Sequence, residues 1–118
     1  MLRSAALSLM LFAAPALARD LPLSCAGEAP GWRLDLLGPV AVFHFPARTE
    51  MEVRLTTPAE GRDWPIAKTL TGPRDTAIVV LQERACVTGH GSFPIEAQVL
   101  TQRGTTPILL TGCCAVVE

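Results

Sequence analysis

The sequence predicts an all-β fold: a small antiparallel meander of seven or eight strands, closed or partly open as a barrel, and held by two disulfides. Three observations predict it. Apolar and polar residues alternate with period two in several short segments, which is typical of half-buried strands. Glycine or proline interrupts the chain about every eight to twelve residues, and no stretch keeps a helical period. Four cysteines lie in 118 residues, as in small exported domains that disulfides stabilise.

The first 18 residues have the composition of a secretory signal peptide. Arg3 gives a positive start, an apolar run follows over residues 5–14, and residues 16–18 (Ala-Leu-Ala) fit a cleavage site. The run is too short for a transmembrane helix. A lipid-attachment box normally has leucine where this chain has Pro22, so we expect a soluble exported protein without a transmembrane segment after processing.

We therefore expect a signal peptide over residues 1–18 and a single β domain over residues 19–118, a length that suits one domain. Without Arg3, nine basic side chains remain against eleven acidic ones. The chain has no cluster of basic residues. This balance argues against a nucleic-acid partner and against a polybasic membrane surface.

Five segments of the first two thirds have strand character. A turn at 27–31, a Gly-Pro turn at 38–39 and a polar loop at 58–65 separate several of them. The five segments are 21–26, 32–37, 40–45, 51–56 and 66–70. The alternation predicts that the inward-facing residues include Trp32, Leu34, Leu36, Met51, Val53 and Leu55.

The last third contains three further strand segments, at 76–84, 94–101 and 107–117, with a glycine-containing loop over Val87–Ser92. Successive side chains of a strand point to opposite faces. Cys113 and Cys114 are neighbours, so they take different partners, and Cys25 and Cys86 are the two candidates. Four cysteines allow three connectivities. A bond between the neighbours Cys113 and Cys114 is sterically poor, and the two connectivities that give them separate partners remain open.

The turn that precedes residue 32 resembles a motif of a widespread family of bacterial exported proteins. The family's signature runs approximately G-x-E-P-F-W-S-x-E-I, and it also precedes META-type, heat-inducible domains. The chain has Ala29 and Gly31 where the family has Glu and Phe. The matching positions are Gly27, Pro30, Trp32, Leu34 and Asp35.

A second motif of the same family is a cysteine, a short polar loop, an aromatic-Pro pair, a strand and then Gly-Cys. Here it corresponds to Cys86, the loop Val87–Ser92, Phe93-Pro94 and Gly112-Cys113. The resemblance implies a small exported β domain with a Cys86–Cys113 disulfide, and no defined activity. We favour Cys86–Cys113 together with Cys25–Cys114, in a periplasmic protein.

Two alternatives place chemistry near His90. A hydrolase would use His90 with Ser92, two residues further on, but catalytic histidines need a positioned nucleophile and carboxylate. A zinc site would use the set Cys86, His90, Cys113 and Cys114, but this spacing lacks the usual cysteine knuckle. An oxidising compartment also favours disulfides. We expect no enzyme activity, no metal and no cofactor.

The remaining hypothesis is a non-enzymatic binding or envelope-associated domain, whose partner is an envelope protein or a small ligand. A second candidate is an inhibitor similar to those of c-type lysozyme, which would present the loops Thr57–Pro65 and Val87–Ser92. We expect Trp32 to plug one end of the barrel and Trp64 to be exposed on its loop. The candidate binding residues are Trp32, Arg62, Trp64, His90 and Ser92.

Overall fold

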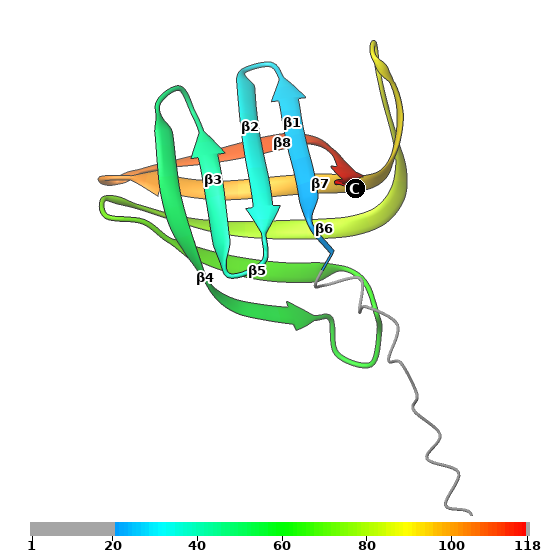
Figure 1. Cartoon of the computed structure of the whole chain (residues 1–118), viewed down its shortest axis with the longest axis horizontal. Helices are drawn as coiled ribbons and strands as arrows, with labels where there is room; N and C mark the ends of the chain where they lie inside the picture. Colours follow the sequence, from blue (N-terminus) through cyan, green and yellow to red (C-terminus); the bar gives the residue numbers. More distant parts are fainter. Residues whose placement is uncertain (1–20, 118) are drawn as a thin grey trace, which may run out of the picture.

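The computed structural model describes residues 21–117, so the expected signal peptide lies outside the described residues. Eight antiparallel strands follow one another around a closed barrel, and β1 pairs with β8 to close it (Figure 1). The strands are β1 (Leu23–Glu28), β2 (Gly31–Leu37), β3 (Val40–His44), β4 (Arg48–Pro58), β5 (Ile66–Thr71), β6 (Asp75–Thr88), β7 (Gly91–Arg103) and β8 (Thr106–Val116). The predicted all-β meander with two disulfides is confirmed, and the barrel is closed.

The alternation of side chains explains why the strands pair in this register. Trp32, Leu34 and Leu36 of β2 point inward and are buried, and so are Ile95 and its alternate neighbours on β7. The side chains between them face the solvent. Because a shift by one residue would expose every inward side chain, the buried face fixes the register.

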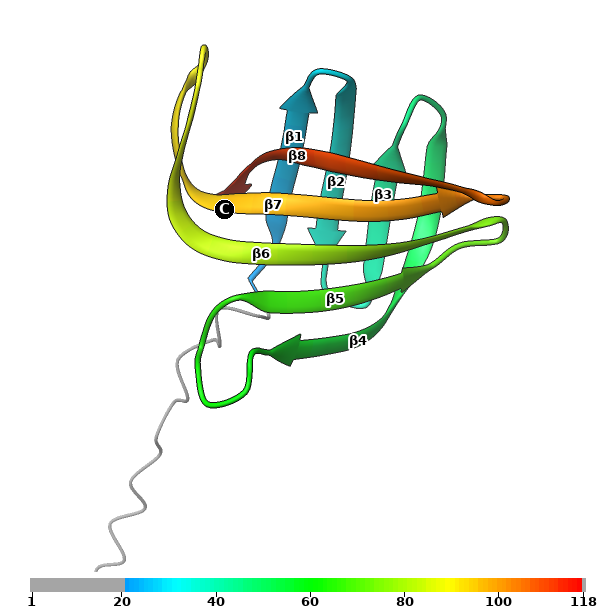
Figure 2. The same ribbon diagram turned by 180° about the vertical axis from the view of Figure 1, so that it is seen from behind.

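The barrel consists of two groups of strands that cross at a steep angle. β1, β2 and β3 run across β5 to β8 in both ribbon views (Figures 1 and 2). β4 belongs to both groups, since Arg48–Glu52 pairs with β3 and Glu52–Pro58 pairs with β5. The aliphatic core lies between the two groups.

A β-bulge in β4 changes one prediction. The alternation predicted Leu55 inward and Thr56 outward, but the register shifts between Val53 and Leu55. A bulge inserts one extra residue, which reverses the faces of the residues after it. Leu55 therefore points outward and is 67% exposed. Thr56 lies opposite the buried Lys68 and accepts a hydrogen bond of 3.2 Å from its Nζ.

The predicted loop Val87–Ser92 is instead the end of a long hairpin. β6 continues to Thr88 and β7 begins at Gly91, so only Gly89 and His90 lie between the strands. The prediction of a loop was wrong because its glycines permit a tight turn, while the backbone groups on both sides pair in the ladder. We call residues 84–94, which extend beyond the barrel after a register shift at Glu83–Cys86, the arm. Figures 1 and 2 show the arm curving away from the direction that β6 and β7 follow in the barrel.

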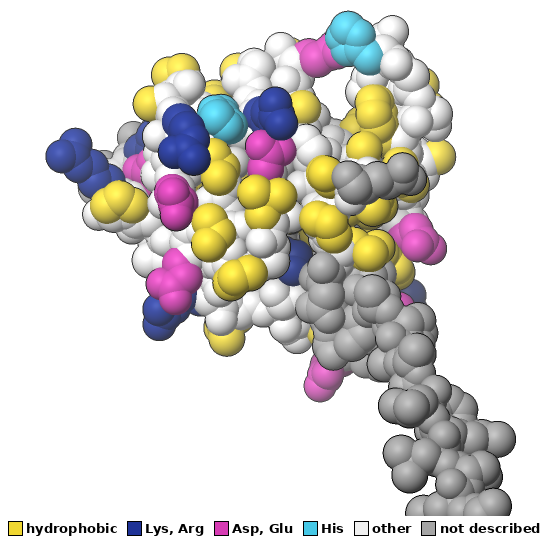
Figure 3. All heavy atoms as spheres, viewed as in Figure 1, with side chains coloured by type: hydrophobic (Ala, Val, Ile, Leu, Met, Phe, Trp, Pro, Cys, Tyr) yellow, Lys and Arg dark blue, Asp and Glu magenta, His cyan; other side chains and the backbone are white. Residues whose placement is uncertain are grey.

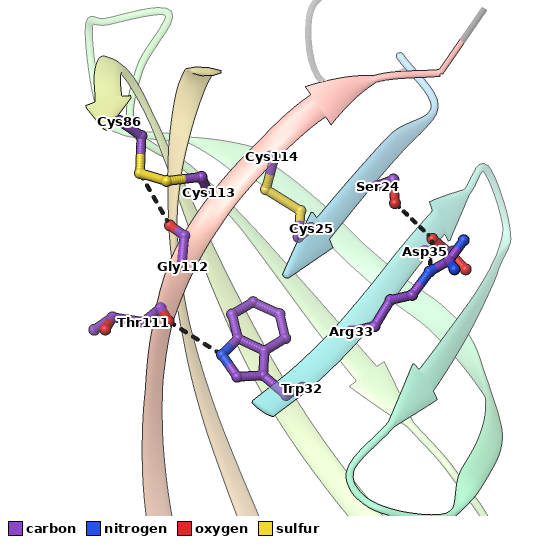
Figure 4. Close-up of a disulfide and its surroundings, with 10 residues drawn as sticks. All are labelled: Ser24, Cys25, Trp32, Arg33, Asp35, Cys86, Thr111, Gly112, Cys113 and Cys114. Carbon is purple, nitrogen blue, oxygen red and sulfur yellow. Dashed lines mark hydrogen bonds and ion pairs between the residues drawn. A yellow bond between two sulfur atoms is a disulfide. The ribbon is translucent and has the colours of Figure 1, made fainter. Parts of the chain in front are cut away.

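The two disulfides confirm the predicted pairing. Cys25 and Cys114 lie directly opposite each other on β1 and β8, and both are buried inside the barrel. Cys113, the residue before Cys114, points outward and is bonded to Cys86 of the arm. Figure 4 shows the two bonds on opposite sides of β8. One disulfide thus joins the closing strands, and the other holds the arm to the barrel.

The part of the chain described here contains no helix with the length and hydropathy of a membrane span.

Candidate functional site

A cavity of about 590 Å³ lies between the arm and the outer surface of β1 and β8. We call it the arm cavity. The space-filling view shows the hollow beneath the arm, at the upper right, with hydrophobic side chains beside it (Figure 3). Small-molecule sites in proteins have volumes of roughly 300–1,000 Å³, so this cavity has a suitable size. Its lining consists of Ser24, Ala26, Gly27, Glu28, Ala29, Cys86, Val87, Thr88, His90, Phe93, Glu96, Thr111, Gly112, Cys113 and Ala115.

The Cys86–Cys113 disulfide forms the base of the arm cavity. It joins the arm to the outward-facing side of β8, with a Cα–Cα distance of 5.6 Å. Cys86 Sγ also lies 3.5 Å from the carbonyl oxygen of Gly112 (Figure 4). Because a covalent bond fixes this end, the arm cannot move away from β8 at its base.

The tip of the arm reaches the turn between β1 and β2. His90 Nε2 lies 3.0 Å from Glu28 Oε1, and both side chains are largely exposed. The backbone N–H of His90 donates a hydrogen bond of 3.1 Å to Thr88 Oγ1, which orders the hairpin turn. An exposed pair of this kind contributes little to stability. The tip is therefore the end of the arm that can open.

Small residues form the floor of the cavity. Ala26 and Gly27 of β1 and Gly112 and Ala115 of β8 line it. A Cβ at Gly112 would meet the carbonyl oxygen of Ala26, and a Cβ at Gly27 would meet the indole of Trp32. These glycines are required because β1, β8 and the indole approach so closely.

Trp32 supports the floor from inside the barrel. It is 4% exposed and donates a hydrogen bond of 3.1 Å from Nε1 to the carbonyl oxygen of Thr111 (Figure 4). The hydrogen bond joins β2 to β8, the strand that closes the barrel by pairing with β1. The expectation that Trp32 is a core residue is confirmed, and its ring does not line the arm cavity.

The lining is apolar with an acidic rim. Val87, Phe93 and the disulfide supply apolar surface, while Glu28 and Glu96 supply carboxylates. Among the described residues that line the cavity, none is Lys or Arg. Arg84 lies outside the lining, with its Nη1 at 3.9 Å from Glu96. The cavity therefore suits a neutral or cationic molecule with an apolar body better than an anion.

The structure does not bring the predicted site residues together. His90 lines the arm cavity, but Ser92 does not, and the His90 ring is in contact with the carboxylate of Glu28. Arg62 is exposed on the loop between β4 and β5. Figures 1 and 2 show that this loop and the arm leave the same end of β5 and β6 and extend in opposite directions, and Pro65 of the loop and Arg84 of the arm line one pocket. The tips of the two loops proposed for an inhibitor therefore point apart, although their bases are neighbours.

The expectation that Trp64 is exposed was wrong. Its side chain is half-buried and packs against the barrel core. The loop brings it there because Ala59 N donates to the Pro65 carbonyl at 2.8 Å, which closes the loop base beside the barrel. Trp64 thus contributes to packing at the end of β5.

All four cysteines form disulfides, so none is available as a thiolate ligand. Within residues 21–117, no group of three or more His, Cys, Asp and Glu side chains is arranged to hold a metal ion.

Sequence reasoning missed Glu28, Val87 and Phe93 as cavity residues. One signal pointed toward them: Cys113 had to face away from the core, and its disulfide partner therefore had to lie outside the barrel. The segment around Cys86 must then cover the outer surface of β8. No local pattern shows how far that segment extends over β1.

Comparisons with protein-family models, with curated proteins and with solved structures gave no match to this chain. The resemblance to exported bacterial proteins therefore stays a prediction.

Proposed function

We propose that this protein is an exported, non-catalytic binding domain whose ligand site is the arm cavity. The observation that carries the proposal is the arm itself, fixed at its base by Cys86–Cys113 and in contact with β1–β2 at its tip through His90 and Glu28. A hairpin held in this way encloses a concave, largely apolar space outside a packed barrel. Apolar clefts with a few polar groups are the usual form of a small-molecule site.

Export is supported by the oxidation of all four cysteines, since disulfides persist in oxidising compartments such as the periplasm. The predicted signal peptide agrees with this location. N-terminal sequencing of the protein from a periplasmic fraction tests it. We expect a mature chain that begins at Arg19, and a chain that retains Met1 in the cytoplasm would contradict export.

The ligand we propose is a small neutral or cationic molecule with an apolar body. Apolar surface removed from water contributes about 25 cal/mol per Å². Glu28 and Glu96 repel an anion and attract a cation at short range. The absence of activity is supported by the positions of His90 and Ser92, because only His90 faces the cavity.

Two dyes with the same aromatic body test the site. 1-Anilinonaphthalene is neutral, and its 8-sulfonate derivative is an anion. We expect saturable binding of the neutral dye and about tenfold weaker binding of the sulfonate, measured by fluorescence titration. Equal or tighter binding of the sulfonate would contradict the acidic rim.

Two matched variants locate the dye. Ala26→Phe fills the floor of the cavity and should abolish binding of the neutral dye, whereas Ala47→Phe, at an exposed turn between β3 and β4, should not change it. Binding that survives Ala26→Phe in a folded protein would overturn the proposed site. Hydrolysis of an ester or peptidoglycan substrate that is lost in His90→Ala would overturn the non-catalytic role.

A further inference from the structure

An apolar row crosses the outer face of five consecutive strands. The strand registers place each member directly opposite the next, from β4 through β8. The row consists of Leu55, Thr69, Ile78, Leu100 and Leu109. Four of these five side chains are large and apolar, and their exposed fractions range from 44% to 67%. Large apolar groups exposed in one contiguous line mark an interaction surface more clearly than scattered ones.

The bulge in β4 completes this row. Without the register shift between Val53 and Leu55, the alternation would place Leu55 inside the barrel. The shift turns it outward beside Thr69, whose hydroxyl oxygen is buried and has no hydrogen-bond partner within the described part of the chain. Thr69 therefore continues the apolar row rather than interrupting it.

The rows on both sides are uncharged from β5 to β8, and on β4 one of them has Thr57 while the other has Glu52 opposite Thr71. One runs from Thr57 on β4 to Thr111 on β8, and the other runs from Thr71 on β5 to Pro107 on β8. Their members are Thr, Gln, Ala, Val and Pro. We call the three rows together the uncharged face, and Figure 2 looks onto its strands. Depletion of charge at the centre is what distinguishes protein interfaces from the rest of the surface.

Charged side chains border the uncharged face, and Glu52 of β4 stands at its corner opposite Thr71. Arg84 and Glu96 form a pair of 3.9 Å at the arm side, and Arg54 and Glu52 form a pair of 3.3 Å on β4. The opposite face of the barrel, over β1 to β4, carries acidic and basic side chains among its apolar ones (Figure 3). The charge distribution of the barrel is therefore strongly asymmetric.

The geometry points to a second copy of this chain as the partner of the uncharged face, in a two-fold symmetric dimer. A two-fold axis brings the same patch of both copies together, so any net charge on that patch would repel itself. An uncharged face avoids this repulsion. The apolar rows of the two copies then bury each other, as the facing sheets of a β-sandwich do.

The size of the face determines how tight the dimer is. Five strands about 4.8 Å apart and three rows about 6.8 Å apart, with side-chain margins, give roughly 500 Å² per copy. Stable dimers bury more, and specific interfaces begin near a total of about 1,000 Å². We therefore expect a dimer that dissociates in the micromolar range. This proposal does not depend on the ligand in the arm cavity.

Sedimentation velocity from about 1 to about 500 μM protein tests the dimer. The wild type should change from monomer to dimer over this range, and Leu100→Lys should stay monomeric because it places two charges at the shared face. Leu37→Lys is the matched control, since Leu37 is 49% exposed against 44% for Leu100 and lies on the outer side of β2.

A wild type that stays monomeric throughout would overturn the proposal, including the case in which the uncharged face binds a different protein. A dimer that Leu100→Lys leaves intact, or that Leu37→Lys disrupts equally, would overturn it as well. Thermal unfolding and circular dichroism of all three proteins confirm that the outward substitutions leave the barrel folded. Loss of dimerisation with unchanged dye binding separates this result from a failure of the arm cavity.

Discussion

Removal of the arm disulfide by the double substitution Cys86→Ala/Cys113→Ala tests both the stability of the barrel and the structure of the cavity. The bond closes a segment with a sequence separation of 27 residues. In the chain-entropy model, this closure contributes about 3.5 kcal/mol at 25 °C, because it restricts the unfolded chain. For a domain of about 100 residues, that loss lowers Tm by roughly 15–25 °C.

The assay is urea unfolding without reductant, followed by tryptophan fluorescence. We expect a free energy of unfolding lower by about 3.5 kcal/mol and an m-value that rises, because the unfolded chain becomes less compact. The matched comparison is Cys25→Ala/Cys114→Ala, which opens a separation of 89 residues and should cost about 4.6 kcal/mol. The burial of both sulfur atoms inside the barrel adds a cavity cost to that second variant.

The same variant distinguishes the role of the arm from that of a general crosslink. If the disulfide holds the arm over β8, its removal should also abolish binding of the neutral dye while the strand content stays native. Removal of a native disulfide usually lowers the free energy of unfolding by about 2–5 kcal/mol. If Cys86→Ala/Cys113→Ala lowers it by less than about 1 kcal/mol, the stability argument is refuted. Unchanged dye affinity in a folded variant would refute the structural role.

Three further predictions concern the floor and tip of the cavity. Gly112→Ala should lower the free energy of unfolding by about 1–3 kcal/mol, measured by thermal unfolding, because its Cβ meets the Ala26 backbone. Gly31→Ala has open space around it and should lower the free energy of unfolding by under about 1 kcal/mol. Equal losses for the two variants would contradict the close approach at Gly112. Trp32→Phe should cost about 1–3 kcal/mol, since the Thr111 carbonyl loses its 3.1 Å hydrogen bond, and an unchanged Tm would contradict that role. Glu28→Gln should change the free energy of unfolding by less than about 1 kcal/mol, because the pair that it forms with His90 is exposed. The same substitution should speed amide hydrogen exchange at the arm tip. Unchanged exchange at the tip would show that the His90 contact does not hold it.

Much of the barrel could be predicted because its signals are local. The alternation of Trp32, Leu34 and Leu36 specifies which face of β2 is buried. The adjacency of Cys113 and Cys114 requires two partners on opposite sides of one strand. Each of these inferences needs only the geometry of a single strand.

The features that were missed depend on long-range pairing. Nothing in residues 51–56 marks the bulge that turns Leu55 outward, because the bulge is set by the pairing with β5. The glycines at 89 and 91 suit a loop and a tight turn equally, so the length of the arm follows only from the pairing of β6 with β7.

The candidate site could not be predicted for the same reason. The arm cavity forms where β1 and β8, at opposite ends of the chain, meet a hairpin that curves over them. The uncharged face depends on the registers of five strands, each of which shows only its own alternation.

Backbone amide NMR during titration with 1-anilinonaphthalene tests whether the arm cavity is the ligand site. We predict saturable shift changes confined to the arm and to the outer residues of β1 and β8, with Ala26, Thr88 and Ala115 among them. Shift changes confined to the uncharged face or to the barrel interior, or none at all, would contradict it.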